Sequence, residues 1–546
     1  MIDLSTTNLD HLGLVAAVCK DINLEKLVNN MIGSKDPRRV VGPGLATVAM
    51  ILNGLGFTSR RLYLTPQFFA NKPVELLLGK GLKAENFDDH ALGRTLDEIS
   101  AYGATRFFGE IAFEIAKNEG MLNGFARWDS TSFSVSGDKY EQDPFSITPT
   151  YGYSKDGRPE LKQVMMGLVV AGSANLPIWM TALSGNASDN KVSRETIESV
   201  KRFQDEIKQN SMLCWTFDAA GFSADNVNRL RNDKWVTRVP EKITEIEKII
   251  TQDSNSFKWL DLEKGYKVAP GQMTYNGVSL RLVVVFSEQA YKKECITFES
   301  KITKEQEKLN KILTHLTKQI FACEKDAIKH FNKLQKEYEF FTLTYKLEST
   351  FKYVKKGRPT SGTKPEIAGY KIVVTNERNK EQIQHAISHK GRFVLAANNI
   401  DLETASDAQI LFEYKEQQGV ERGFKFLKDP WFMADTLFLK TPRRIEALMA
   451  IMTLCLLIYN LAQYRFRLKL QEQKELIPNQ KNKPTQNPTL HWIFQLFEGI
   501  TAVSFKVAID STTSVIIANL TELRKKIIRL FGYTACQIYG LSYIET

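Results

Sequence analysis

The sequence has few cysteines, and no two of them lie close together. The six cysteines are scattered and form no C-x-x-C pair, which argues against a structural zinc site of the usual spacing. Scattered cysteines are typical of proteins in a reducing cytosol, so we expect a cytoplasmic protein. Residues 1–5 lack the basic and apolar regions of a signal peptide. We also find no internal repeat.

Long apolar runs are missing as well. The longest extends from Ala447 to Tyr459, between Glu446 and Asn460. It falls short of the roughly 20 residues that a membrane span needs. We therefore expect a buried helix here and no membrane partner.

What the sequence does have is length, apolar content and positive charge. Its 546 residues are 43% hydrophobic, and the formal net charge is +11. This length suggests two to four domains with a sizeable core. A basic balance favours a polyanionic partner such as nucleic acid or a membrane surface, although a basic protein with no such partner is the alternative.

Apolar periodicity divides the chain into helical and α/β regions. Residues 1–120 have helical spacing and are expected to bind DNA, bind a second subunit or cap the core. Strands are expected at 125–135, 161–171, 176–183 and 212–217, with a helix at 193–208 capped by Ser193 and another at 223–231. Together they predict a mixed α/β sheet.

The remaining chain is expected to contain an insertion and a second part of the core. We predict five regions: 1–120, helical; 121–240, first part of the core; 241–398, inserted; 399–470, second part of the core; 471–546, a polar linker and C-terminal helices. The insert should contain strands at 267–275, 279–286, 340–347, 369–375 and 392–397 and a long helix at 303–338. Further helices are expected at 406–427 and 443–470.

Two aspartates occupy unusual positions in the predicted strands. Asp129 lies mid-strand, and Asp218 ends an apolar strand ahead of Gly221. An aspartate inside or ending such a strand is costly unless it is paired or bound to a metal ion. Asp218 has an alternative explanation as the cap of the following helix, whereas the neighbours of Asp129 continue the strand.

A third acidic residue lies on an unusually polar helix face. Tyr414, Gln417, Glu421 and Lys428 are separated by three, four and seven residues, which places all four on one face of a continuous helix. A buried face would normally be apolar. This one is either a functional face or a solvated one.

These residues resemble the signature of bacterial insertion-sequence DDE transposases of the insertion-sequence-four superfamily. That signature is Tyr, two residues, Arg, three residues, Glu, six residues, Lys, and every spacing matches from Tyr414 to Lys428. Gln417 stands where the family has Arg, so it can form a hydrogen bond but carries no charge. The resemblance identifies Asp129 and Asp218 as the two aspartates that accompany Glu421.

The resemblance covers roughly residues 8–500. The segments 152–163 and 185–189 look like further family motifs, the first of them a basic loop. An α/β fold is implied, with an RNase H-like catalytic core, a large insert between the second aspartate and the glutamate, a preceding helical domain and following C-terminal helices. The resemblance also implies catalytic and metal-binding roles for Asp129, Asp218 and Glu421.

Strand cleavage and transfer need charge stabilisation around a phosphodiester. Two Mg²⁺ or Mn²⁺ ions can activate the attacking oxygen and stabilise the leaving one, and carboxylates are suitable ligands. The expected partner is double-stranded DNA, as terminal inverted repeats and target DNA, bound by a homodimer in a synaptic complex. The expected location is the bacterial cytoplasm, at the nucleoid when DNA is bound.

Basic residues near these acids are candidate DNA contacts. The expected DNA-binding residues are Tyr414, Gln417, Lys428, Lys155, Arg158, Lys162, Arg422 and Lys425. The basic segment 355–359 could insert into a minor groove or be an ordinary loop. His385 and His389 have the spacing of a helical metal pair, but Ala386 replaces the glutamate of a metalloprotease motif, and we expect surface residues.

Other assignments stay open. Asp138, Asp156, Asp189 and Asp225 are alternative carboxylates; Asp189 is the strongest rival to Asp218, and Asp225 suits a helix start. The leading hypothesis is a transposase that moves an insertion sequence by cut and paste. The alternatives are a catalytically inactive DNA-binding protein derived from a transposase and an RNase H-like nuclease without strand transfer.

Overall fold

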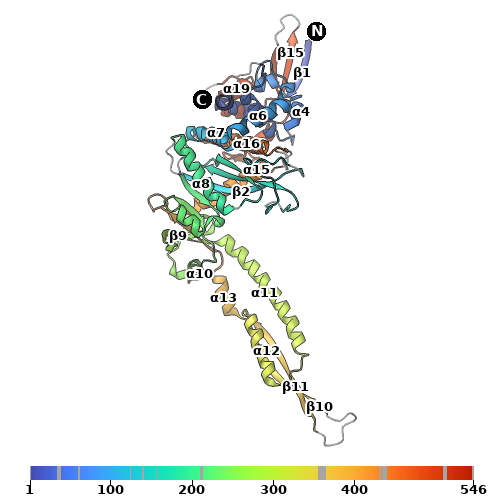
Figure 1. Cartoon of the computed structure of the whole chain (residues 1–546), viewed down its shortest axis with the longest axis vertical. Helices are drawn as coiled ribbons and strands as arrows, with labels where there is room; N and C mark the ends of the chain where they lie inside the picture. Colours follow the sequence, from blue (N-terminus) through green and yellow to red (C-terminus); the bar gives the residue numbers. More distant parts are fainter. Residues whose placement is uncertain are drawn as a thin grey trace. The chain divides into compact units, whose positions relative to one another are not determined.

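The chain forms two compact units, residues 1–237 with 412–546 and residues 238–411. The computed structural model (Figure 1) describes residues 2–33, 38–58, 62–122, 124–137, 140–154, 157–187, 189–208, 213–353, 364–429, 432, 439–507 and 513–543. The expected insert, residues 241–398, lies within the second unit. Residues 1–120 and 471–546, expected as separate regions, belong to the first unit together with the sheet that carries both aspartates.

The first unit begins with a short strand and continues with helices. Pro43 at the first turn of its helix suits a position whose N–H has no intrahelical partner. Asp88 caps another helix by accepting a hydrogen bond from Ala91 N–H. The helices are α1 (Leu12–Asp21), α2 (Leu24–Ile32), α3 (Pro43–Leu55), α4 (Thr65–Phe69), α5 (Val74–Leu78), α6 (Asp89–Tyr102) and α7 (Ala104–Asn118).

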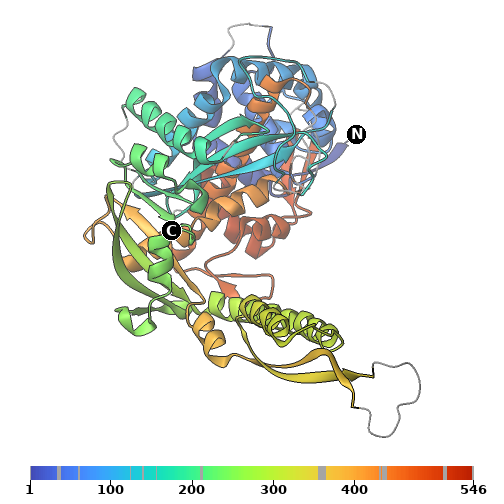
Figure 2. The same ribbon diagram turned by 60° about the horizontal axis from the view of Figure 1, so that its bottom comes forward.

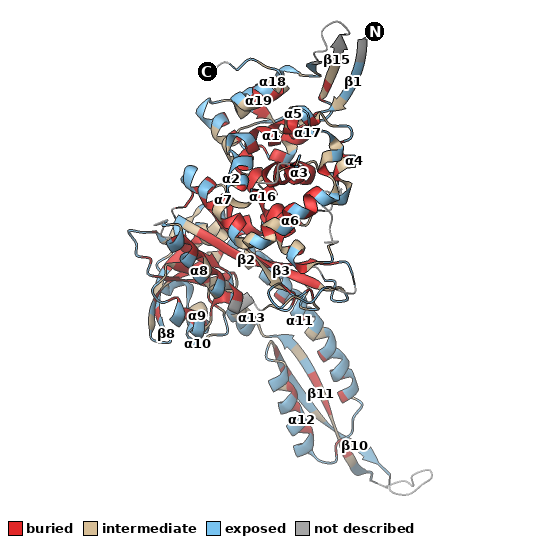
Figure 3. Cartoon of the chain, turned by 45° about the horizontal axis from the view of Figure 1, so that its top comes forward, coloured by how far each residue is buried: buried red, intermediate tan, exposed pale blue. Residues whose placement is uncertain are grey.

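A mixed sheet follows, with strands in the order β4-β3-β2-β5-β6. The first three strands are antiparallel neighbours, whereas β5 is parallel to both β2 and β6. The strands are almost wholly buried, as β2 and β3 show in Figure 3. Their bounds are β2 (Gly124–Ser134), β3 (Gln163–Ala171), β4 (Leu176–Ser184), β5 (Leu213–Phe217) and β6 (Trp235–Arg238). The expected mixed α/β sheet is confirmed.

Helices cover both faces of this sheet. On one face lies α8 (Asp189–Glu206), which begins four residues before the expected cap Ser193, so Ser193 is an interior residue. On the other face, α15 (Gln418–Leu427) packs on β2 and β3, and α16 (Pro442–Glu472) packs on β4. Figure 2 shows these orange helices against the cyan and green strands. A short helix, α9 (Ala224–Arg229), follows β5.

Helix α16 is the central helix of the first unit. By length and composition it is apolar enough to cross a membrane, but 83% of its apolar window is buried inside the protein. It packs against α3, α6 and α7 and is drawn red for burial in Figure 3. The buried helix expected from the run at 447–459 is therefore present.

The C-terminal segment differs from the wholly helical expectation. It contains α17 (Leu490–Leu496), α18 (Glu522–Phe531) and α19 (Tyr533–Ile538), but also the strands β15 (Thr501–Val507) and β16 (Thr513–Ala518). The strand β1 (Ile2–Asn8) pairs antiparallel with β15. Pairing between opposite ends of the sequence leaves no local signal, which explains why both were missed. The expected polar linker contains the short strands β13 (Ile477–Pro478) and β14 (Pro484–Thr485).

The second unit contains four antiparallel strands in the order β12-β9-β8-β7. Arg281 on β9 pairs with Asp407, which ties this sheet to the end of the unit. The strands are β7 (Leu260–Leu262), β8 (Tyr266–Tyr275), β9 (Val278–Ser287) and β12 (Arg392–Asn398), and the helices α10 (Thr244–Ile250) and α13 (Lys380–Ser388) flank them in sequence. The expected strands at 267–275, 279–286 and 392–397 are present.

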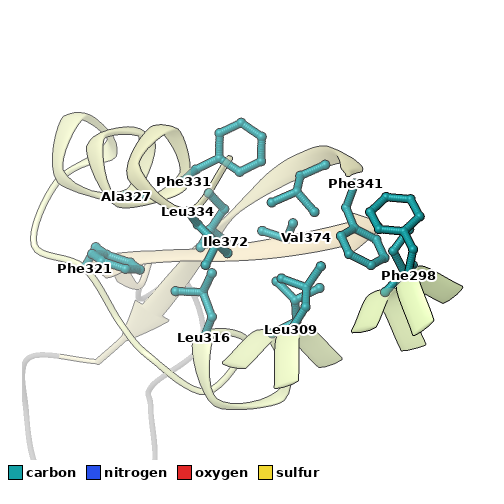
Figure 4. Close-up of a cluster of buried hydrophobic side chains, with 13 residues drawn as sticks. Phe298, Leu309, Leu316, Phe321, Ala327, Phe331, Leu334, Phe341, Ile372 and Val374 are labelled. Carbon is teal, nitrogen blue, oxygen red and sulfur yellow. The ribbon is translucent and has the colours of Figure 1, made fainter. Parts of the chain in front are cut away.

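The same unit contains a helix pair that packs on a long hairpin. The single helix expected at 303–338 is instead α11 (Glu288–Leu316) and α12 (Glu324–Glu337), separated by a turn. The hairpin is β10 (Phe341–Lys352) with β11 (Glu366–Arg378). Their facing side chains form a hydrophobic core of 13 residues, in which Leu309, Phe331 and Ile372 meet (Figure 4).

Candidate functional site

Asp129 and Asp218 lie on neighbouring parallel strands. Arg127 of β2 pairs in register with Thr216 of β5, so two residues further along each strand come Asp129 and Asp218. Asp129 is half-buried, and Asp218 is exposed directly after the carboxyl end of β5. The two aspartates are therefore at the same level of the sheet.

Each carboxylate also has a local hydrogen bond. Asp129 Oδ1 accepts from Ser130 N–H at 2.7 Å, and Asp218 Oδ1 accepts from Ala220 N–H at 3.1 Å. The capping role that was the alternative for Asp218 is present, in a 3₁₀ turn over Ala219–Gly221. A cap of this kind uses one oxygen of the Asp218 carboxylate.

Glu421 lies on the helix that packs over the face of β2 carrying Asp129. Leu168 of β3 pairs with Asp129, and a Cβ on Gly423 of α15 would lie 3.6 Å from Leu168 Cδ2. Side chains alternate along a strand, so Asp129 and Phe133 share a face of β2. Lys428 at the end of α15 places Nζ 5.5 Å from the Phe133 ring centroid. Helix α15 thus runs along β2 and passes Asp129.

Glu421 is exposed on α15, whereas Val420, Phe424 and Leu427 are among the residues that the helix buries. Glu421 and Lys428 are seven residues apart, close to two helical turns, so they project from the same side. Within the described ranges, no three His, Cys, Asp or Glu side chains are gathered closely enough to hold a metal ion.

The opposite face of β2 is closed by α8. A Cβ on Gly167 would lie 3.3 Å from Trp128 Nε1 and 3.9 Å from Thr196 Oγ1 of α8. The carboxylates therefore have one accessible face, the one shared with α15. Asp129, Asp218 and Glu421 are carboxylates, the ligand type that hard divalent cations such as Mg²⁺ prefer, but among the described residues they are not gathered into a metal site.

Helix α14 (Asp407–Lys415), which precedes α15, is tied to β2 by a buried ion pair that was not predicted from the sequence. Arg127 Nη2 donates to Glu413 Oε2 at 2.5 Å, with side chains 4% and 14% exposed. Arg127 Nη1 also donates to the Gly172 carbonyl and to Asn175 Oδ1. An arginine in a buried strand two residues before Asp129 was the signal available in the sequence, because such a cation needs a carboxylate partner.

The expected continuous helix at 406–427 is interrupted. It consists of α14 (Asp407–Lys415) and α15, and the turn between them has shorter-range hydrogen bonds, such as Gly419 N–H to Glu416 O at 2.7 Å. Because of this turn, Tyr414, Gln417 and Glu421 do not lie on the one face of a continuous helix that was expected. Gln417 is only 8% exposed, and Tyr414 is half-buried.

The other expected DNA contacts are dispersed. Lys155 lies outside the described residues. Arg158 is exposed beside Glu160 at 3.6 Å, and Lys162 Nζ lies 5.6 Å from the Tyr140 ring centroid, both in the loop that joins β2 to β3. Lys425 is exposed. Arg422 projects from α15 into a cavity on the side away from Glu421.

The alternative carboxylates do not form a rival cluster among the residues described. Asp225 begins α9 and pairs with Arg194 and Arg229, and the Arg229 hydrogen bond lowers the pKa of Asp225. Asp138, Asp156 and the side chain of Asp189 lie outside the described residues, as does the basic segment 355–359. His385 and His389 are surface residues on or next to α13, with Nε2 atoms 3.4 Å apart.

This sheet has one aspartate inside β2 and one directly after the adjacent parallel strand β5, and it defines a candidate for metal-assisted chemistry on an open face. The chain belongs to the transposase DDE domain family, whose model matches residues 128–460. That match includes both aspartates and Glu421. A second family model, a domain of unknown function (DUF4277), matches residues 4–113.

Comparison with solved structures found a piggyBac transposase synaptic complex with hairpin DNA. The two chains are 10% identical, with 89% of this chain and 78% of that chain covered, and the TM-score is 0.34. A likeness of that size supports no conclusion about this fold. No curated protein matches the sequence.

Proposed function

We propose that the protein is an insertion-sequence transposase that cleaves and joins DNA strands by cut and paste at Asp129, Asp218 and Glu421. The observation that carries the proposal is the equal register of the two aspartates on β2 and β5, with Glu421 on the helix over the same face. We assign it to the insertion-sequence-four superfamily and its Tyr-Arg-Glu-Lys signature group. Gln417 is the departure from that signature.

The strand order supports an RNase H-like core. Placing β5 parallel beside β2 brings the first and second aspartates together, although 88 residues separate them in the sequence. Residues 238–411 then form the insert between the second aspartate and the glutamate. After this insert, α15 packs on the face of β2.

Asp129, Asp218 and Glu421 would hold two Mg²⁺ or Mn²⁺ ions. When bound, these ions activate the attacking oxygen and stabilise the leaving oxygen of a phosphodiester. Lys428, on the same side of α15 as Glu421, holds a backbone phosphate beside the carboxylates. Arg127 and Glu413 are positioning residues, because they fix α14 and α15 against β2 without reaching the open face.

The substrate is double-stranded DNA, as the terminal inverted repeats of the element and a target, processed by a homodimer in the bacterial nucleoid. The exposed cations Arg158 and Lys425 and the half-buried Lys162, on the β2–β3 loop and α15, contribute backbone contacts. These contacts supply affinity that weakens with salt.

The test is cleavage of duplex DNA carrying the element's terminal repeat, with Mg²⁺. Asp129→Asn, Asp218→Asn and Glu421→Gln should each lower cleavage at least about a thousandfold while binding persists, because the lost charge acts in the transition state. Glu416→Gln, at the turn before α15, is the matched control and should cleave like the wild type. Wild-type cleavage by Glu421→Gln, or binding without cleavage by the unaltered protein, would contradict the proposal.

A further inference from the structure

A cavity of about 540 Å³ lies on the side of α15 away from Glu421, entirely within the first unit. Its walls come from α15, α16, the turn between β3 and β4, and the residue that caps α17. Gly419 and Gly423 line the cavity from α15, and because they have no side chains, they do not fill it. None of the described residues that line the cavity is an aspartate or a glutamate.

Three lining side chains have their acceptor atoms already used. Tyr459 Oη accepts from His491 N–H at 3.1 Å, Gln463 Oε1 from Leu490 N–H at 2.9 Å, and Thr489 Oγ1 from Trp492 N–H at 3.3 Å. The backbone of α17 uses one acceptor site on each of these side chains, and each keeps a hydroxyl hydrogen or an amide NH₂ that can donate to a ligand. Asn460 is the exception among the polar side chains that line the cavity, because its Nδ2 donates to the Asn175 carbonyl and its side-chain oxygen is an acceptor.

Two guanidinium groups add positive charge to those donors. Arg467 Nε donates to the Pro488 carbonyl at 2.8 Å, which fixes the side chain while its two Nη groups stay available. Within the described part of the chain, no carboxylate pairs with Arg467. Arg422 has only a long contact of 3.7 Å with Glu416, between exposed side chains, so it is free to turn toward a ligand.

The donor groups are held in place by packing. The Tyr459 ring lies 4.7 Å from that of Phe426 and 6.2 Å from that of Phe494, measured between centroids. Burial lowers the pKa of Arg467 and raises that of Tyr459. A partly desolvated cation beside fixed donors gains from an anionic ligand more than an exposed one does.

We propose that this cavity is a phosphate-binding site in which Arg422, Tyr459, Gln463, Arg467 and Thr489 bind a backbone phosphate of DNA. Donors that converge from several walls suit the unshared oxygens of a phosphate, and the forked guanidinium groups match them in geometry. Because the cavity lies on the other side of α15, this site differs from the carboxylate site. The identification of the bound phosphate as part of DNA rests on the proposed function, whereas the proposal that the cavity binds phosphate does not.

Gln463→Glu is the sharpest test. A carboxylate can still accept from Leu490 N–H, so the local fold is preserved, but the donor NH₂ becomes a second negative oxygen. Gln495→Glu makes the same change on the exposed surface of α17 and is the matched control. Arg467→Gln is a second variant that removes the charge, and thermal unfolding of each variant reports whether it is folded.

Binding is measured by calorimetry in EDTA, with inorganic pyrophosphate and separately with duplex DNA, so that the carboxylate site is not engaged. We expect Gln463→Glu and Arg467→Gln to weaken both ligands about tenfold or more, and Gln495→Glu to leave both within about twofold. If the two variants weaken the binding of pyrophosphate but not of DNA, the cavity is a phosphate-binding site whose ligand is a free phosphate compound. Equal binding of pyrophosphate and DNA by wild type and Gln463→Glu would overturn the site.

Discussion

Arg127 Nη2 and Glu413 Oε2 lie 2.5 Å apart, and this hydrogen-bonded ion pair joins the strand of the first candidate aspartate to the helix before α15. Both side chains are almost fully buried, so neither charge can regain water if its partner is removed. The pair therefore determines how α14 is held against β2. Arg127 Nη1 also donates to Asn175 Oδ1 and to the Gly172 carbonyl.

Removal of one partner from this pair should be more damaging than removal of both. Glu413→Met should lower the free energy of unfolding by about 3 kcal/mol, because it leaves a buried arginine without its counter-charge. The double variant Arg127→Met with Glu413→Met should lose less than the sum of the two single variants. Urea unfolding of the four proteins measures this coupling, and strict additivity would show that the pair is not coupled.

Alanine at Gly419 should destabilise the protein although alanine favours helices. A Cβ there would lie 2.1 Å from Asn175 Oδ1, the oxygen that accepts from Arg127. The cost of displacing the Asn175 side chain should outweigh the higher helix propensity of alanine relative to glycine, which is worth about 1 kcal/mol. Thermal unfolding should show a lower midpoint, and Asn175→Gly added to Gly419→Ala should restore it.

Gly423→Ala is the comparison for that experiment. Its Cβ would meet the end of the Leu456 side chain at 3.0 Å, an atom that can move more easily. Its effect should be smaller than that of Gly419→Ala. An unfolding midpoint of Gly419→Ala at or above the wild type would rule out the close approach of α15 to the β3–β4 turn.

Protonation of His11 should destabilise the first unit at acidic pH. His11 is buried, its ring stacks on Phe494 at 4.1 Å, and Nε2 lies 2.8 Å from the Leu55 carbonyl oxygen. Burial lowers the pKa of His11 from 6.5 to about 4. The lowered pKa means that the unfolded chain binds the proton first, so stability is full above pH 6.5 and falls as the pH decreases toward 4.

The loss should approach about 3 kcal/mol at the acid end of this window. Urea unfolding at several pH values measures it against His11→Gln, which cannot be protonated there. The stability advantage of the wild type over this variant should shrink as the pH falls from 6.5 to 4. An advantage that stays constant over that range would mean that His11 is not held neutral by burial.

Lys428→Ala should weaken DNA binding most at low salt. The loss of one phosphate contact should reduce the salt slope of the binding constant by about 0.9. Lys428→Arg keeps the charge and should preserve the slope. Gel shifts over a salt series measure both variants, and an unchanged slope for Lys428→Ala would remove Lys428 from the DNA contacts.

Local patterns predicted most elements of the fold. The strand of Asp129 and the strand before Asp218 were predicted to within about two residues, because buried strands have a strong apolar signal. The spacing from Glu421 to Lys428 also corresponds to one side of a real helix. These features depend on short stretches of sequence, in which periodicity is informative.

Features set by distant contacts could not be predicted in this way. The pairing of β1 with β15 joins opposite ends of the sequence, and the turn after Lys415 breaks a helix whose apolar pattern continues through it. The burial of Gln417 follows from that turn. The donor-lined cavity depends on hydrogen bonds between α16 and α17, which no spacing in the sequence indicates.

The central claim is that Asp129, Asp218 and Glu421 hold metal ions together, and Fe²⁺-mediated cleavage of the protein backbone tests it most directly. Fe²⁺ with ascorbate and peroxide generates radicals that cut the chain next to the bound ion. The account predicts cuts near residues 129, 218 and 421, suppressed by excess Mg²⁺ and absent in Asp129→Asn. Cuts near only one of these positions, or cuts that Asp129→Asn leaves unchanged, would contradict it.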